Sequence, residues 1–204
     1  MAQRTHDLVI VGASFAGLAA ARAAALRGLD VVVIDRKEEP GARCATTGIL
    51  VKEAADELDL PLHLTRKIRT ARIYSPKLAH VDLTAPGYYF LSTDTPEVMR
   101  SLAAEAARAG AQLKFGTRFV DGARENGYIR VGDLRTRYLL GADGAKSRVA
   151  RAFNLGRTKR FLVGLEAEYQ GVALDEALHC FADSRWAPGY LGWALPGVGI
   201  TQVG

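Results

Sequence analysis

The sequence predicts an α/β protein in which a Rossmann-like nucleotide-binding domain is interleaved with a smaller β-rich domain. Three observations lead to this prediction. A short apolar strand from Asp7 to Val11 runs into the glycine-containing turn Gly12-Ala-Ser-Phe-Ala-Gly17. An alanine-rich helical stretch and a second apolar strand follow, and the acidic Asp35 ends that strand. This order of elements is that of a βαβ unit that binds a dinucleotide.

Each residue of this unit has a physical reason for its place. Gly12 permits the tight turn, and the small Ser14 lets the backbone approach a pyrophosphate where the pattern has its second glycine. Gly17 allows the helix to pack on the sheet, and the helix N-terminus offers free N–H groups to phosphates. Asp35 lies 18 residues beyond Gly17, which suits a carboxylate that binds ribose hydroxyls. The alternative is a tight strand-to-helix turn without a ligand.

Composition narrows the classes of function. The 204 residues, 49% hydrophobic and 24% charged, are typical of a globular chain with a sizeable core. No apolar run reaches the ~20 residues that span a bilayer, and two cysteines cannot form a disulfide framework. We therefore expect a cytoplasmic protein. The net charge of +5 allows contact with an anionic membrane surface but does not favour nucleic acid. The four histidines show no metal-ligand spacing, so no metal site is predicted.

The remaining elements follow from periodicity and turn signals. Residues 49–58 suggest a short helix, and residues 94–109 suggest a longer one that Gly110 ends. A hairpin is expected around Asn126-Gly127. Strands are expected at 68–74, 79–83, 88–91, 112–120, 134–140, 161–169, 178–182, 190–195 and 199–203.

These elements divide into two interleaved domains. We expect the nucleotide-binding domain to comprise residues 1–65 and 92–158, and the β-rich domain residues 66–91 and 159–204. The strands of residues 66–91 should pair with those after Phe161, since this stretch leaves the βαβ alternation. The last strand has nothing after it to cover it, so we expect a truncated chain with an incomplete β-rich domain.

Several segments together resemble the geranylgeranyl reductases. Besides the first turn, they are the loop Pro40-Gly-Ala-Arg-Cys-Ala45 and the segment Gly141-Ala-Asp-Gly-Ala-Lys-Ser-Arg148. A further segment is Pro188-Gly-Tyr-Leu-Gly-Trp-Ala-Leu-Pro196 with Gly204, which is similar to the family's Tyr-x-Trp-x-Phe-Pro signature. Leu191 and Leu195 replace the signature's Tyr and Phe. The resemblance implies FAD, the p-hydroxybenzoate-hydroxylase type of fold and NAD(P)H as electron donor.

The resemblance also assigns roles to residues. Alternatives remain for some of them: Arg43 as an exposed loop residue, Cys44 as a packed thiol, Asp143 as a helix cap, and Trp193 as a core aromatic. The implied FAD contacts are Gly12, Ala13, Ser14, Ala16, Gly17, Asp35, Arg36, Arg43, Cys44, Val120, Asp143 and Gly144. The implied substrate cavity comprises Leu191, Trp193, Leu195 and Pro196. No catalytic residue is nominated.

The function implied by the resemblance is an FAD-dependent oxidoreductase. It would pass hydride from NAD(P)H through the flavin to an alkene of an apolar, isoprenoid-like substrate. Two alternatives stay open. One is a flavin monooxygenase, either a hydroxylase or, with less support, a halogenase. The other is a flavin- or nucleotide-binding module without turnover.

Overall fold

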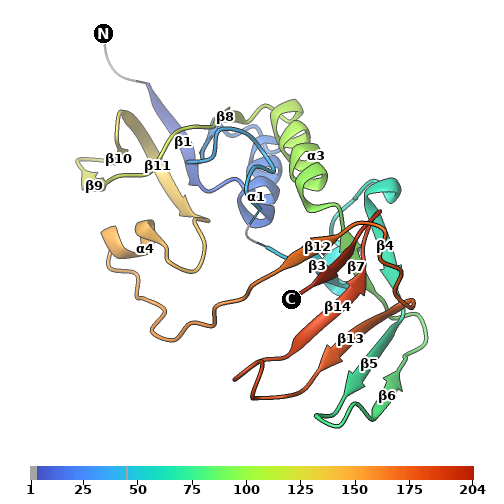
Figure 1. The fold of residues 1–204 in the computed structure, drawn as a ribbon. Helices are drawn as coiled ribbons and strands as arrows, with labels where there is room; N and C mark the ends of the chain where they lie inside the picture. Colours follow the sequence, from blue (N-terminus) through green and yellow to red (C-terminus); the bar gives the residue numbers. More distant parts are fainter. Residues whose placement is uncertain (1–3, 45) are drawn as a thin grey trace. The chain divides into compact units, whose positions relative to one another are not determined.

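The chain forms two compact units, each built from two separate stretches of sequence. Unit 1 comprises Met1–Arg43 and Met99–Arg160, and unit 2 comprises Cys44–Val98 and Phe161–Gly204. The computed structural model describes residues 4–44 and 46–204. The predicted α/β class is confirmed by the mixture of sheets and helices (Figure 1).

Unit 1 is built on a six-stranded sheet with β1 near its middle. β1 (Thr5–Val11) pairs in parallel with β2 (Val31–Ile34) on one side and with β11 (Leu134–Gly141) on the other. β8 continues the parallel part beyond β2, and the hairpin of β9 and β10 adds antiparallel strands beyond β11. The order is β8 (Gln112–Lys114), β2 (Val31–Ile34), β1 (Thr5–Val11), β11 (Leu134–Gly141), β10 (Tyr128–Val131) and β9 (Gly122–Glu125).

The sequence of the first unit explains its local structure. α1 (Phe15–Ala25) consists largely of alanine, the best helix former, and it joins β1 to β2. Its Leu18 and Ala21 are buried, and Gly28 lies in the turn that follows the helix, with φ +80°. α3 (Thr95–Arg108) precedes β8, and the short α4 (Arg148–Ala152) follows β11.

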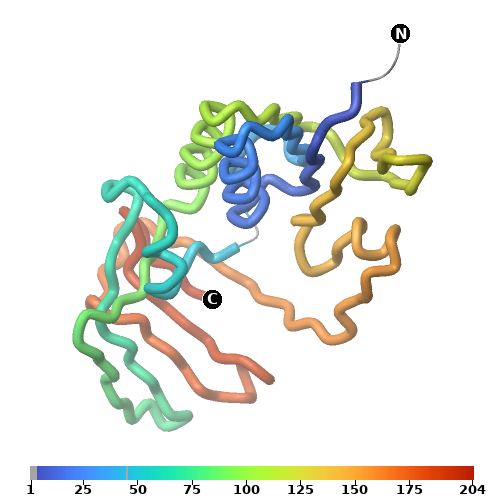
Figure 2. The backbone as a smooth tube through the Cα atoms, turned by 180° about the vertical axis from the view of Figure 1, so that it is seen from behind, coloured from blue at the N-terminus to red at the C-terminus, as the bar shows by residue number. Residues whose placement is uncertain are grey.

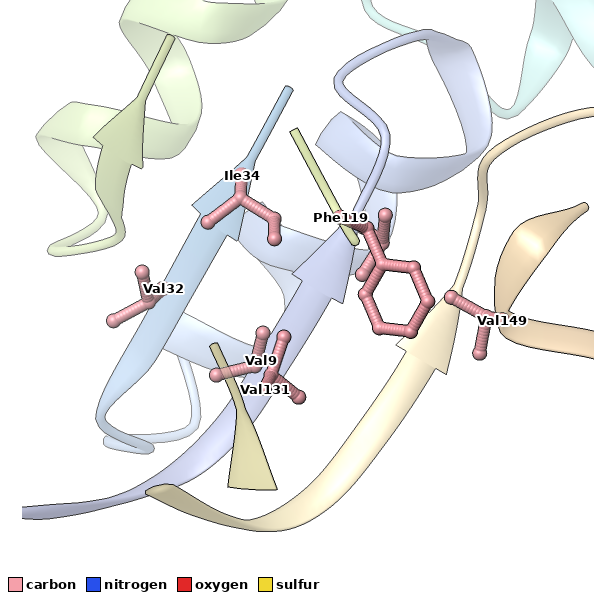
Figure 3. Packing of buried hydrophobic residues seen from close by; sticks show 7 residues of the cluster. Val9, Val32, Ile34, Phe119, Val131 and Val149 are labelled. Atoms are coloured by element: carbon pink, nitrogen blue, oxygen red, sulfur yellow. The ribbon is translucent and has the colours of Figure 1, made fainter. Parts of the chain in front are cut away.

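One face of this sheet carries a core of branched side chains. Phe119, which follows β8 in the chain, packs over this face, and Figure 3 shows its ring beside side chains from β1 and β2 and from α4. Strand side chains alternate between the two faces, so every second residue of β1 and β2 points here. The buried members are Val9, Val11, Val32, Ile34, Phe119, Val131 and Val149.

Unit 2 contains a large and a small sheet. β5 of the first stretch pairs in parallel with β13 of the second, as Thr70 to Tyr74 align with Ala177 to Phe181. The predicted pairing of residues 66–91 with strands after Phe161 is thereby confirmed for β5, whereas the strands at the two ends of this stretch pair in the small sheet instead. The large sheet has the order β12 (Ala167–Tyr169), β15 (Thr201–Val203), β14 (Gly192–Pro196), β13 (Ala177–Phe181), β5 (Thr70–Tyr74) and β6 (His80–Leu83).

Because of the small sheet, the boundaries between the two units differ from those that the sequence predicts. β3 (Ile49–Val51) and β4 (Thr65–Ile68) both pair with β7 (Phe90–Thr93), so residues 44–65 and 92–98 belong to unit 2. The expected helix at 49–58 begins as β3 and becomes helical only in α2 (Lys52–Asp56), which is followed by the 3-10 turn Leu62–Leu64. A three-residue strand leaves no periodicity that a sequence pattern can reveal. Figure 2 follows both stretches of this unit through the chain.

A paired substitution tests the packing of unit 1. Phe119 is 4% exposed, whereas the adjacent Val120 is 76% exposed. We expect Phe119→Ala to lower the free energy of unfolding of this unit by about 3–5 kcal/mol, because it leaves a cavity between β1, β2 and α4. Val120→Ala should change it by less than ~0.5 kcal/mol. Denaturant unfolding measures both, and equal effects of the two variants would contradict this packing.

Candidate functional site

The turn between β1 and α1 is closed so tightly that two of its positions exclude any side chain. Gly12 has φ +106°, and a Cβ there would lie 2.3 Å from the carbonyl oxygen of Ala142. A Cβ on Gly17 would lie 1.8 Å from the carbonyl oxygen of Gly12. Both contacts are with backbone, which cannot move aside as a side chain would. Glycine is therefore required at both positions by the close packing of the turn, and contact of the turn with a ligand remains a prediction.

Asp35 is held against the same turn by two backbone donors. The N–H of Ala13 donates to Asp35 Oδ2 at 2.7 Å, and the N–H of Lys37 donates to Oδ1 at 2.8 Å. The backbone of Asp35 is fixed as well, since the N–H of Thr117 donates to its carbonyl oxygen at 2.8 Å. Each carboxylate oxygen keeps further acceptor capacity. The side chain is thus oriented in advance for hydroxyl donors.

The first turn of α1 has no side-chain cap of its own. Ser14 occupies the N-cap position with extended backbone, and its side chain makes no capping hydrogen bond. The first turn of α1 contains no acidic residue. The first N–H groups of a helix have no intrahelical acceptor and carry the positive end of its dipole. A phosphate group placed here would receive those hydrogen bonds, and Ala16 is exposed beside them.

Asp143 has a structural role. Its Oδ1 accepts from the Ser147 hydroxyl at 2.6 Å, and its Oδ2 accepts from the backbone N–H of Arg148 at 2.6 Å. Ser147 in turn accepts from the N–H of Ala150, so the two side chains cap α4 together. This is the capping alternative, although the capped helix begins three residues later than Ala145. Contact of Asp143 and Gly144 with FAD remains a prediction.

The remaining predicted FAD contacts lie in loops of the two units. Arg36 follows Asp35 directly and is exposed, and Val120 is exposed in the loop after Phe119. Arg43 is exposed at φ +45° and is the last residue of its stretch of unit 1, whereas the half-buried Cys44 begins unit 2. Ala45, the end of the predicted Arg-Cys loop, lies outside the described residues. The roles of these loop residues stay predictions.

The predicted substrate-cavity residues belong to the core of unit 2. Trp193 is 8% exposed and Leu195 is fully buried, in one cluster with Ile68, Leu178 and Cys180. Leu191 is partly buried against the same cluster, and Pro196 is buried in β14. The alternative of a core aromatic therefore describes Trp193 as the structure shows it. Lining of a substrate cavity by these four residues remains a prediction.

A cavity of about 380 Å³ lies elsewhere in unit 2. It is bounded by the end of α2, the loop after it and strands of the small sheet. Tyr89 is fixed in its wall, since its hydroxyl donates to Asp56 at 2.6 Å and Lys67 Nζ lies 4.4 Å from its ring centroid. Lys52 and the Tyr89 hydroxyl lower the pKa of the Asp56 carboxyl through hydrogen bonds. The lining residues are Ala55, Asp56, Glu57, Leu58, Asp59, Leu60, Leu62, Thr65, Lys67, Tyr89 and Leu91.

Comparison with known proteins identifies the family. Residues 5–182 match the FAD binding domain family, and the chain belongs to that family. It is 30% identical over 219 residues to a digeranylgeranylglycerophospholipid reductase of Methanosarcina acetivorans, covering 98% of this chain and 54% of the relative. It is 37% identical over 159 residues to a rifampicin monooxygenase of Rhodococcus hoagii, covering 71% of this chain and 33% of the relative. The chain spans about half the length of the reductases that it matches.

Solved structures agree with this assignment. A geranylgeranyl bacteriochlorophyll reductase-like protein of Thermoplasma acidophilum superposes with a TM-score of 0.82 at 25% identity, covering 99% of this chain and 56% of that one. PqsL of Pseudomonas aeruginosa shares the fold, with a TM-score of 0.74 at 20% identity over 98% of this chain and 60% of its own. The expected resemblance to geranylgeranyl reductases and the expected cofactor FAD are confirmed.

The geometry of unit 1 fits FAD. The side-chain-free turn at Gly12 and Gly17 admits a diphosphate, the N-terminus of α1 complements its charge, and Asp35 offers acceptors to ribose. Sequence reasoning did not find Ala142, although its carbonyl oxygen is what requires glycine at position 12. No local signal could reveal it, because Ala142 is distant in the chain and arrives only through the pairing of β1 with β11.

The two cysteines should react differently with thiol reagents. Burial raises the pKa of the Cys180 thiol, so less thiolate forms at a given pH, and the side chain is only 6% exposed. In a Cys44→Ser variant we expect Cys180 to be alkylated at least tenfold more slowly in the folded protein than in denaturant, most strongly below its raised pKa. Mass spectrometry of timed iodoacetamide reactions measures this, and equal rates would contradict the burial of Cys180.

Proposed function

We propose that this chain belongs to an FAD-dependent oxidoreductase that is similar to geranylgeranyl reductases. The proposal rests on the hydrogen bond that the N–H of Ala13 donates to the Asp35 carboxylate. This bond lies beside a turn so close-packed that a Cβ at Gly12 would strike Ala142. These groups offer sites for ribose and for diphosphate within one unit. The family match to an FAD binding domain and the reductase relatives support the same conclusion.

The division of labour follows from these contacts. FAD, when bound, would supply two-electron chemistry, in which a hydride from a nicotinamide donor and a proton from an acid together saturate an alkene. Unit 1 holds the dinucleotide, Asp35 orients its ribose, and the first turn of α1 offsets phosphate charge. Unit 2 supplies an apolar interior around Trp193 and Leu195. NAD(P)H as donor and an isoprenoid-like alkene as substrate are parts of the proposal, and the substrate rests on the names of the reductase relatives.

A second candidate is an FAD-dependent monooxygenase. The rifampicin monooxygenase relative is 37% identical over 159 residues, a higher identity over a shorter stretch than the reductase relative has, and its name supports this alternative. Substrate-dependent oxygen uptake would separate it from the reductase, which would consume NAD(P)H without oxygen. Tight FAD binding with no electron acceptor would favour a binding module. Halogenation has the least support, because the segment Leu191-Gly-Trp-Ala-Leu-Pro196 resembles the Trp-x-Trp-x-Ile-Pro motif of halogenases but has Leu191 in place of its first Trp.

We also propose that the protein works at a membrane surface. The reductase relatives act, by their names, on a glycerophospholipid, and such a substrate resides in a membrane. No helix in the described part of the chain has the length and apolar character needed to cross a bilayer.

Substitution of Asp35 tests the proposed cofactor site. Asp35→Asn removes the charge and turns an amide NH₂ toward one of the two backbone donors, so we expect FAD to bind about tenfold to a hundredfold more weakly. Titration with FAD, followed by flavin fluorescence or calorimetry, measures the affinity. Asp121→Asn is the matched control, since Asp121 is an exposed carboxylate in the same unit.

The outcomes separate the alternatives. Weaker FAD binding in Asp35→Asn with unchanged binding in Asp121→Asn supports the site. Unchanged affinity in both variants, with circular dichroism showing an intact fold, would contradict the assignment of FAD to this unit. Oxidation of NAD(P)H under anaerobic conditions that depends on a prenylated lipid would then identify the reductase.

A further inference from the structure

β6 (His80–Leu83) is a free edge of the large sheet of unit 2. It pairs with β5 on one side, and no strand within the described residues 4–44 and 46–204 pairs with its other side (Figure 1). All four of its residues are exposed. An unpaired strand edge presents a row of N–H and C=O groups to any strand that approaches it. A further strand can therefore reach the outer side of β6.

The backbone groups that point outward from β6 belong to His80 and Asp82. In the hairpin that joins β5 to β6, the N–H of Ser75 donates to the carbonyl oxygen of Ala79 at 2.8 Å. Opposite residues of an antiparallel pair alternate between positions that are hydrogen-bonded to each other and positions that are not. The register then places Val81 at a position bonded to β5, whereas the N–H and C=O groups of His80 and Asp82 point away from β5.

The side chains of β6 separate into an apolar and a polar face. Val81 and Leu83 are two residues apart, so they point to the same face of the sheet, and they are 57% and 55% exposed. This face continues into β5, where Ile73 lies opposite Val81. His80 and Asp82 alternate with them and point to the other face. The edge thus presents two branched apolar side chains on one face, and an imidazole and a carboxylate on the other.

β6 has little that would prevent it from pairing. Edge strands are usually protected by a short length, by charged side chains or by proline. At the other edge of the same sheet, β12 has only three residues, with Glu168 at its centre. β6 contains no Lys or Pro. Its carboxylate is bound within its own sheet, because Arg72 donates to Asp82 Oδ1 at 2.7 Å and to Oδ2 at 2.9 Å. These bonds also lower the pKa of the Asp82 carboxyl, so it stays ionised.

A second copy of β6 complements this edge in one antiparallel register. Hydrogen-bonded pairs must join outward residues, so three registers bring His80 opposite His80, His80 opposite Asp82, or Asp82 opposite Asp82. Only the second of these places an N–H donor against a carboxylate, and a two-fold axis makes that contact twice. Two carboxylates directly opposite each other are destabilising. The second register also places Val81 opposite Val81 and Leu83 opposite Ala79, so apolar side chains meet on the apolar face.

We propose that the protein forms a two-fold symmetric dimer in which β6 of one copy pairs with β6 of the other. Each copy has one β6 edge, so the assembly closes at two copies. A single strand pair buries less area than the ~1,200 Å² of a stable complex, so the dimer should be reversible and depend on concentration. Complementary charge sets the register more than the affinity. The contact needs no FAD and does not rest on the proposed function.

Sedimentation velocity tests for the dimer. The mass should rise from that of one chain toward that of two as the concentration increases from about 10 µM to about 1 mM. Val81→Lys places two cations opposite each other at the two-fold axis and should weaken association at least tenfold. Val163→Lys is the matched control, because Val163 is 89% exposed in the same unit, and it should weaken association less than threefold.

Cysteine cross-linking measures the register. In a Cys44→Ser variant, Val81→Cys would place two thiols opposite each other with Cα atoms ~4.5 Å apart, within the range that a disulfide spans. Leu83→Cys would place them four residues apart along the paired strands, at ~13 Å, which is beyond that range. Under mild oxidation we expect Val81→Cys to give a linked dimer at least tenfold faster than Leu83→Cys.

Four results would overturn the proposal. They are the mass of a single chain at every concentration, association that Val81→Lys leaves unchanged, growth beyond two copies, and cross-linking of Leu83→Cys as fast as that of Val81→Cys. FAD titration of Val81→Lys separates this proposal from the proposed function. Its affinity for FAD should match that of the unaltered protein, and failure of the unaltered protein to bind FAD would count against the proposed function alone.

Discussion

The close approach of three strand ends in unit 1 is the constraint on which the candidate site depends. β1 ends at Val11, which lies in register with Ile34 of β2 and with Gly141 of β11. The next residues are therefore brought together: Gly12, Asp35 and Ala142. The N–H of Gly12 donates to the carbonyl oxygen of Ile34 at 2.9 Å, and the N–H of Ala142 donates to that of Val11 at 2.8 Å. A side chain at position 12 would strike the carbonyl group of Ala142 and disrupt this junction.

The local parts of this arrangement could be read from the sequence. The turn from Gly12 to Gly17, the helix after it and the acidic end of β2 are neighbours in the chain, and each has a chemical signal. The hairpin at Asn126-Gly127 was predictable for the same reason, and the structure has β9 and β10 on either side of it.

The parts that required the structure are those set by contacts between distant residues. The pairing of β3 with β7 moved residues 44–65 into unit 2, and a strand of three residues gives no pattern of its own. Asp143 follows an apolar strand, as a ligand-binding residue and a capping residue both do, and only its bonds to Ser147 and Arg148 show the cap. Trp193 was open to two interpretations because a core aromatic and a cavity wall look alike in sequence. Its place among Leu178, Cys180 and Leu195 shows the core.

We propose that FAD binds with its diphosphate at the N-terminus of α1 and its ribose at Asp35. Amide chemical shifts of isotope-labelled protein, recorded by NMR during FAD addition, test this most directly. We predict that the largest changes occur at Ala13, Ser14, Phe15 and Lys37, whose N–H groups surround the turn. Changes confined to unit 2, or no change at these four amides when FAD is bound, would contradict it.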